Sequence, residues 1–248
     1  MIIAYRTDKG AQRQNNQDAV GAYYNQNNIP LMLVADGVAS NPGSQQASQL
    51  VIHFLGEAWQ LTTLTLLDEI KDWLDKTIAQ ANETVIEVGQ NHQATANMAT
   101  TIVLAVVVGN QLLVANAGDS KAYYVRDQRL TQLSFDHTLR NELARQDGKD
   151  YDAKLPEANS ITRYVGVNNQ IDLEYHQHQL EKNDIIFLTS DGLPKALTDH
   201  EMAAIISSNQ PLQERVDELI DEANRRDASD NITALIAMSD QAASDRKD

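Results

Sequence analysis

The stretch LMLVADGVASNPG, residues 31–43, carries the pattern that decides the fold. Five apolar residues, 31–35, run directly into Asp36 and then into a turn that contains Gly37. An apolar run without polar alternation is typical of a short strand buried on both faces, and here the acid marks its carboxyl end. One isolated Asp-Gly pair is ordinary turn chemistry, so the pattern gains meaning only if the chain repeats it.

The chain places four further acids at the ends of apolar runs. They lie in RQNNQDAV (13–20), LLVANAGDS (112–120), DIIFLTSDG (184–192) and DASDNITALIAM (227–238), and they are Asp18, Asp119, Asp191 and Asp230. Strand-end acids that converge suit hard divalent cations, which prefer oxygen ligands. The sequence therefore favours a carboxylate metal site over a set of unrelated turns.

The composition limits the class of protein and its partners. The chain has 248 residues and 42% hydrophobic content, enough for one large domain or two small ones. A net charge of −15 repels nucleic acid and anionic lipid, so we expect neither as a partner. There is no cysteine, and no apolar run approaches the length of about 20 residues that crosses a bilayer. We expect a cytoplasmic protein that does not bind membranes.

Helices and strands are expected in a mixed order. Hydrophobic stripes predict helices over 43–59, with Ser44 as N-cap, and over 67–90. Residues 98–134 read as three strands joined by turns at 109–110 and 127–128, which makes this part of the sheet antiparallel. Residues 136–165 are polar and irregular, with one short helix at 140–146, and this segment is called the flap below.

The last third of the chain continues the mixed pattern. Strands are expected over 171–180 and 184–192, helices over 199–209 and 212–226, and a final strand from residue 231. The prediction is an α+β fold, a central antiparallel β-sandwich flanked by helix pairs, in a single domain over residues 1–240. Residues 241–248 form a polar C-terminal tail.

Eight short motifs occur in an order that resembles a known family. They are RQNNQD (13–18), VADG (34–37), MATT (98–101), VANAGDSKAY (114–123), FDHTLRNEL (135–143), ITRYVG (161–166), LTSDGL (188–193) and SDNIT (229–233). Together they resemble the metal-dependent serine/threonine protein phosphatases of the 2C class, in their short bacterial form, from about residue 5 to residue 238. The resemblance implies a β-sandwich that holds two or three Mg²⁺ or Mn²⁺ ions at one end of its sheets.

The resemblance also implies the metal ligands, which are Asp18, Asp36, Gly37, Asp119, Asp191 and Asp230. Asp36 looks like the carboxylate that bridges two metals, and the Gly37 carbonyl like a ligand of the second. Asp191 and Asp230 would complete the first site, and Asp18 would hold the second metal through water. Asp119, together with Asp191, resembles the third-metal site of bacterial members.

The implied activity is removal of phosphate from phosphoserine and phosphothreonine in proteins. A hydroxide that bridges the metals would attack phosphorus in line, while Arg13 holds the phosphoryl oxygens. The implied partners are phosphorylated proteins, among them a bacterial serine/threonine kinase and its targets, and we expect a monomer. The acidic surface predicts a preference for basic or neutral segments around the phosphoresidue.

Two departures from the family pattern leave alternatives open. Gln17 stands where the family commonly has Glu, and DGVASN (36–41) replaces the bacterial DGMGGH. These changes suit a catalytically silent relative that binds a phosphoprotein or kinase as a regulator. A third possibility keeps the metal site but makes the substrate a small phosphorylated metabolite. Retention of the aspartates favours the enzyme, since a scaffold need not preserve them.

Overall fold

Two antiparallel sheets of five strands each form the centre of the molecule in the computed structural model, which describes residues 1–38, 41, 43–91, 95, 97–149, 151, 157–166 and 170–238. The first sheet, in spatial order, contains β1 (Ile2–Asp8), β10 (Ile232–Met238), β9 (Ile185–Thr189), β6 (Lys121–Arg126) and β7 (Arg129–Gln132). The second contains β2 (Asp18–Tyr24), β3 (Pro30–Asp36), β4 (Ile102–Val108), β5 (Gln111–Ala117) and β8 (Glu174–Gln179).

The inner faces of the two sheets pack against each other. A buried cluster joins Met32, Val34, Val103 and Val114 of the second sheet to residues of the first, Ile186, Leu188, Leu235 and Ala237. Strands β3 and β10 are buried along nearly their whole length, because helices cover the opposite faces of the sheets. This explains why their sequences are continuous apolar runs rather than alternating ones.

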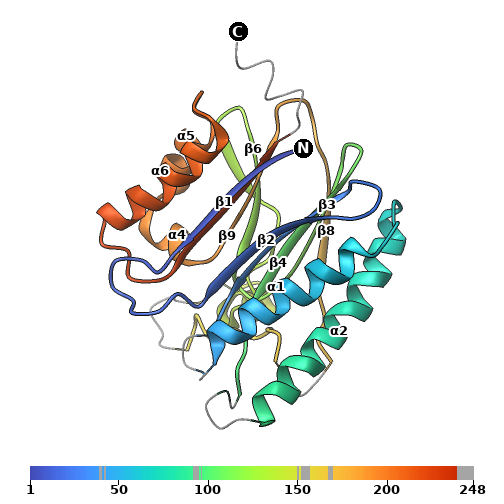
Figure 1. The fold of residues 1–248 in the computed structure, drawn as a ribbon. Helices are drawn as coiled ribbons and strands as arrows, with labels where there is room; N and C mark the ends of the chain where they lie inside the picture. The colour runs from blue at the N-terminus through green and yellow to red at the C-terminus, as the bar shows by residue number, and fades with distance from the viewer. Residues whose placement is uncertain are drawn as a thin grey trace.

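Helices cover both outer faces of the sandwich (Figure 1). The helices are α1 (Ser44–Gln60), α2 (Leu67–Asn91), α3 (Leu139–Asp147), α4 (Gly192–Ala196), α5 (Asp199–Ile206) and α6 (Leu212–Arg225). Helices α1 and α2 bury their apolar stripes against the second sheet, and α4, α5 and α6 bury theirs against the first. The expected α+β sandwich flanked by helices is confirmed.

Two local expectations were wrong. Residues 98–134 contain four strands rather than three, because the single strand expected between the turns at 109–110 and 127–128 is divided into β5 and β6, which lie in different sheets. Gly118 lies at this crossover with φ of 121°, and a Cβ there would come within 2.6 Å of the Thr101 side chain. The N-cap of α1 is Gly43 in the left-handed conformation, whereas Ser44 donates its hydroxyl to the Val38 and Asn41 carbonyls.

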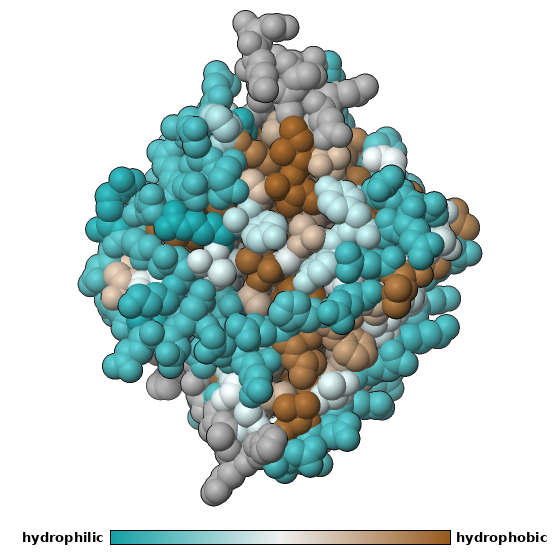
Figure 2. All heavy atoms as spheres, viewed as in Figure 1, coloured by the Kyte–Doolittle hydropathy of each residue, from teal (hydrophilic) through white to brown (hydrophobic). Residues whose placement is uncertain are grey.

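The surface agrees with the acidic composition. The face in Figure 2 is mostly hydrophilic, with a narrow hydrophobic strip between the two helical layers. None of the helices in the described part of the chain is long and apolar enough to cross a membrane. Residues 39–40 of the DGVASN stretch and the tail 241–248 lie outside the described residues.

Candidate active site

The strand-end acids gather at one end of the sandwich. Asp18 opens β2 and Asp36 closes β3, and the two residues are direct cross-strand partners. In the other sheet, Asp191 follows β9 and Asp230 precedes β10, so both lie at the same end of this antiparallel pair. Asp119 lies where the chain crosses between the sheets. Antiparallel pairing therefore joins the acids of each sheet, and packing of one sheet on the other brings the two pairs together.

The MATT motif fixes the backbone of Asp36. The Asp36 amide donates to Thr101 Oγ1 at 3.0 Å, and its carbonyl accepts from the Thr101 amide at 2.8 Å and from Thr100 Oγ1 at 2.9 Å. The next residue must be glycine, since a Cβ on Gly37 would lie 2.6 Å from the Ser44 carbonyl oxygen. These contacts fix the backbone at the end of β3, where the apolar run 31–35 passes into Asp36 and Gly37.

Asp18 connects the two sheets. Its Oδ2 accepts hydrogen bonds from Ser190 Oγ at 2.6 Å and from Thr233 Oγ1 at 2.7 Å; Ser190 directly follows β9, and Thr233 lies in β10 of the first sheet. Its Oδ1 is buried and has no hydrogen-bond partner. Burial raises the pKa of Asp18 to about 6, although the two hydroxyl groups counteract part of this rise. One carboxylate oxygen is therefore oriented by the protein and the other is left for a ligand.

Mutual repulsion makes this cluster unfavourable without a cation. Burial raises the pKa of Asp36 well above its ordinary value, and the charges of Asp18, Asp191, Asp119 and Asp230 raise it further. Burial also raises the pKa of Asp119 to about 7, with Asp191 adding repulsion. Carboxylates with raised pKa values that face one another indicate a functional site, because a stable fold gains nothing from the arrangement.

Two side-chain cations lie against the cluster. Lys195 Nζ is 2.6 Å from Asp191 Oδ2 and 2.9 Å from Asp230 Oδ2, while the Arg13 guanidinium is 2.9 Å from Asp230 Oδ1. Burial alone would lower the pKa of Lys195, but the two acids more than offset this effect and raise it. The contacts of Lys195 with Asp191 and Asp230 could not be predicted from the sequence, because they depend on the pairing of β9 with β10.

The donor set of the cluster fits a hard divalent cation. All its ligand atoms are oxygens, and Asp18 Oδ1, Asp119 Oδ1 and Asp191 Oδ1 are buried without hydrogen-bond partners. Within the described residues, no three acidic or imidazole side chains already surround a single point that an ion could fill. Small side-chain rotations, with displacement of Lys195, would be needed to close the coordination sphere.

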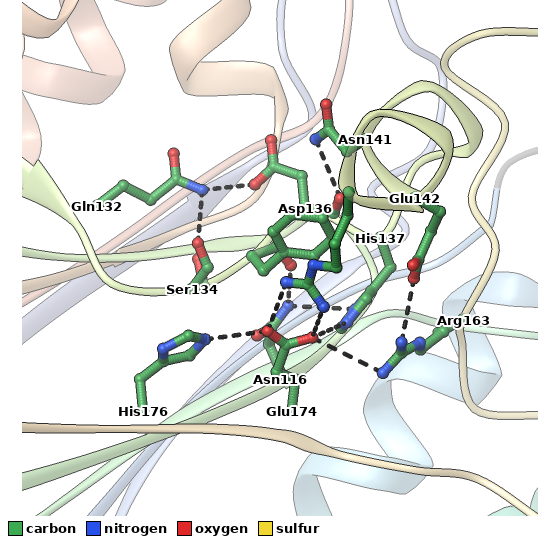
Figure 3. A network of polar contacts seen from close by, with 12 residues as sticks. Asn116, Gln132, Ser134, Asp136, His137, Asn141, Glu142, Arg163, Glu174 and His176 are labelled. Carbon is green, nitrogen blue, oxygen red and sulfur yellow. Dashed lines mark hydrogen bonds and ion pairs between the residues drawn. The ribbon is translucent and has the colours of Figure 1, made fainter. Parts of the chain in front are cut away.

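A polar network attaches the flap to β8 beside the cluster (Figure 3). Glu174 of β8 accepts two hydrogen bonds from the Arg145 guanidinium, at 2.7 and 2.9 Å, and lies 3.1 Å from Nε2 of the buried His137. Hydrogen bonding to Arg145 lowers the pKa of Glu174 to about 2, whereas burial lowers the pKa of His137. His137 is therefore neutral and donates from Nε2 to Glu174.

The same network positions the residue before Asp119. His137 Nδ1 accepts from the Gly118 amide at 3.1 Å, and Asn116 Nδ2 donates to the Gly118 carbonyl at 3.2 Å and to the Phe135 carbonyl at 2.7 Å. These bonds hold the crossover between the sheets and the start of the flap as one unit. Glu174 could not be recognised from the sequence, since it lies in a polar, alternating strand that resembles an ordinary solvent-exposed edge.

Comparisons with known proteins agree with this fold and cluster. The chain is 33% identical over 243 residues to the serine/threonine phosphatase stp of Listeria monocytogenes, covering 97% of this chain and 96% of the relative. It is 32% identical to the protein phosphatase PhpP of Streptococcus pneumoniae, covering 98% and 100%. The solved S. agalactiae serine/threonine phosphatase superposes with a TM-score of 0.89 at 33% identity, covering 96% and 99%. The chain is thus a protein-serine/threonine phosphatase, a hydrolase that acts on phosphoproteins.

A family model gives the narrower assignment. The model described as protein phosphatase 2C matches residues 8–237, nearly the whole chain. The protein belongs to the protein phosphatase 2C family, whose members are metal-dependent. The resemblance drawn from the eight motifs is confirmed, and the silent-relative alternative is not favoured.

Proposed function

We propose that the aspartate cluster binds two Mg²⁺ or Mn²⁺ ions, and a third beside Asp119 and Asp191, to hydrolyse phosphoserine and phosphothreonine in proteins. Asp36 would bridge the first two ions, with Asp191 and Asp230 on one side and Asp18 and the Gly37 carbonyl on the other. The observation that carries the proposal is the set of buried carboxylate oxygens without hydrogen-bond partners, in a cluster whose pKa values are raised. Oxygen donors of this kind are typical ligands of both ions.

The residues around the cluster would have separate roles in the reaction. When bound, the ions activate a water molecule for in-line attack and withdraw charge from the phosphoryl oxygens. Arg13 lies at the edge of the cluster, where its planar guanidinium can turn from Asp230 to two phosphoryl oxygens. Ser190 and Thr233 orient Asp18, and the Thr100-Thr101 pair fixes Asp36. The Gln17 side chain is half-buried next to Asp18 and would contact the water shell of the second ion.

The direct test measures hydrolysis of a phosphothreonine peptide with Mn²⁺, with Mg²⁺ and with a chelator. We expect turnover only with a divalent ion, and isothermal titration should resolve two or three binding events per chain. Activity that survives exhaustive chelation would refute the metal site. Comparison of kcat/KM for phosphopeptides and sugar phosphates separates a protein substrate from a small metabolite.

Replacement of Lys195 by Met should increase the affinity for Mn²⁺ about tenfold. The Lys195 ammonium lies between two proposed ligands and must be displaced, so its removal relieves both competition and repulsion. Titration calorimetry of the apo protein measures the change without reference to turnover. The control is Lys76→Met, the same charge change on the exposed face of α2. Weaker Mn²⁺ binding by the Lys195 variant would mean that the ammonium supports the site instead.

Replacement of Arg13 by Ala should lower kcat/KM about a hundredfold and weaken inhibition by inorganic phosphate. The expected loss follows from removing a two-point, charge-assisted contact to the phosphoryl group. Arg13 is 39% exposed and, among the residues that the structure describes, bonds only to those of the 229–230 turn, so we expect the unfolding temperature to stay almost unchanged. Equal phosphate inhibition of both proteins would show that Arg13 does not bind the phosphoryl group.

Other predictions from the sequence remain untested. They are the single domain over residues 1–240, the cytoplasmic location, the monomeric state, the kinase partner, and the lack of nucleic-acid and membrane binding. The relatives named phosphatase make phosphoproteins the substrate class, and a kinase that makes those phosphoproteins is the natural counterpart. Sedimentation and phosphoproteomic comparison of cells with and without the gene would test the monomer and the kinase partner.

A further inference from the structure

A cavity of about 510 Å³ adjoins the aspartate cluster on the side of the flap. Asp119 and Asp191 line one wall, and Thr138 and Arg140, at the start of α3, line the flap wall. Lys121 and Lys195 also line it. The cavity is large enough for more than one side chain, so a bound phosphosegment can extend from the reacting phosphate into it.

The flap wall carries hydrogen-bond donors without acceptors. Thr138 Oγ1 and Arg140 Nε are buried atoms that have no hydrogen-bond partner. Thr138 is the N-cap of α3, yet its hydroxyl makes no capping bond, and the first amides of the helix bond instead to the Ala158 and Ser160 carbonyls. Buried polar atoms are normally satisfied, so a pair of orphaned atoms at one cavity wall indicates a missing acceptor.

Arg140 differs from the arginines around it. Arg145 and Arg163 of the flap pair with Glu174 and Glu142, but among the described residues no carboxylate pairs with the Arg140 guanidinium. A half-buried guanidinium normally finds a carboxylate or phosphate, since its donors match these groups in geometry and charge. In this cavity the Lys121 ammonium forms an ion pair with Asp136. Arg140 is therefore the cation on the flap wall that can bind an anion.

The two walls of the cavity differ in the charge of the ligand that each can bind. Asp119 and Asp191 present oxygens without partners and would be neutralised by a cation in the proposed third site. Displacement of Lys195 from Asp191 would then leave its ammonium facing the same cavity. The wall of acids takes a cation, and the flap wall takes an anion beside it.

We propose that Thr138 and Arg140 form an anion subsite for a second negatively charged group on the substrate, a carboxylate or a phosphate a few residues from the phosphoresidue. The inference rests on the proposed function, because the neighbouring aspartates define where the reacting phosphate lies. It also qualifies the expectation from net charge: the surface favours basic or neutral segments overall, whereas this position selects an acidic group.

The test compares peptides that differ at one position. Phosphothreonine peptides carry Ala, Glu or phosphoserine at each position from four before to four after the phosphothreonine. For wild-type protein, kcat/KM at the preferred position should be about tenfold higher with Glu or phosphoserine than with Ala. Arg140→Gln should reduce this ratio to about one and leave hydrolysis of the Ala peptide unchanged. Preference for phosphoserine alone would identify a doubly phosphorylated segment as the ligand.

The control and the binding measurement make the test independent of turnover. The control is Arg129→Gln, the same substitution in β7. Arg129 pairs with Arg126, at the end of β6 opposite to Lys121, so this variant should keep the wild-type ratio. Fluorescence anisotropy with Asp36→Asn protein in Mn²⁺ should show about tenfold tighter binding of the Glu peptide than of the Ala peptide, and the added Arg140→Gln change should abolish this difference. Equal binding of the peptides to Asp36→Asn protein would overturn the subsite. Lack of hydrolysis of every peptide by wild type would refute the proposed function alone.

Discussion

Replacing Asp36 by Asn should lower kcat/KM on a phosphothreonine peptide about a thousandfold. The side chain lies at the centre of the cluster, where the charges of Asp18, Asp191, Asp119 and Asp230 all act on it. If Asp36 is the shared ligand of two ions that we propose, its loss removes several kcal/mol of transition-state stabilisation, and each 1.4 kcal/mol is worth about tenfold. Asparagine keeps the shape, and the backbone bonds to Thr100 and Thr101 do not depend on the carboxylate.

A second consequence of the same substitution separates lost chemistry from lost folding. In a chelator, the Asp36→Asn protein should be more stable to urea than wild type, because one member of a set of repelling carboxylates is gone. Asp72→Asn, on the exposed face of α2, should alter neither activity nor stability. An inactive variant that is also less stable than wild type would attribute the loss to the fold, and the proposed role of Asp36 would fail.

The sequence was most informative where burial is two-sided. Strands β3, β9 and β10 are covered on both faces, so their continuous apolar runs could be recognised without any knowledge of the fold. Strand β1 is half-exposed and polar over its last three residues, and α4 has only five residues, including Pro194, so neither carries a clear period. The crossover from β5 to β6 was missed because the stretch between the two turns reads as one strand, and the short break at residues 118–120 does not show that the chain passes to the other sheet.

The clustering of the aspartates was predictable from the sequence, but the residues that support them were not. The aspartates follow apolar runs, and their order matched a family pattern, so they could be named from the sequence. Lys195 and Glu174 could not, since each acquires its partners only through tertiary structure: Lys195 through the pairing of β9 with β10, and Glu174 through the return of the flap to β8. Alternation along β8 indicates which side chains share a face, but not what that face meets.

The apo protein should become more stable as the pH falls from 8 to about 5.5. The pKa values of Asp18 and Asp119, about 6 and about 7, lie above the ordinary 3.8, and that of Asp36 is raised as well. The folded state therefore binds more protons than the unfolded state, so stability falls as the pH rises through these values. The shift in the pKa of Asp18 alone, from 3.8 to about 6, lowers the free energy of unfolding at pH 8 by about 3 kcal/mol.

Groups with lowered pKa values oppose this trend, and two of them, His137 and Glu174, belong to the network beside the cluster. Burial lowers the pKa of His137, so its contribution falls as the pH drops below about 6.5 and offsets part of the gain from the three carboxyl groups. The pKa of Glu174 is lowered to about 2, and the stability that it contributes above its ordinary value of 4.5 is lost as the pH falls towards 2. We therefore expect maximal stability of the apo protein near pH 5.

Urea unfolding in a chelator from pH 4 to pH 8, repeated with saturating Mn²⁺, measures this balance. Ions that bind only the folded state stabilise it by about 2.7 kcal/mol at a hundred times Kd, and they hold the aspartates ionised. Mn²⁺ should therefore raise stability most at pH 8 and flatten the pH dependence. If the chelated protein is instead more stable at pH 8 than at pH 5.5, the aspartates do not repel one another in the fold, and the electrostatic basis of the metal site is wrong.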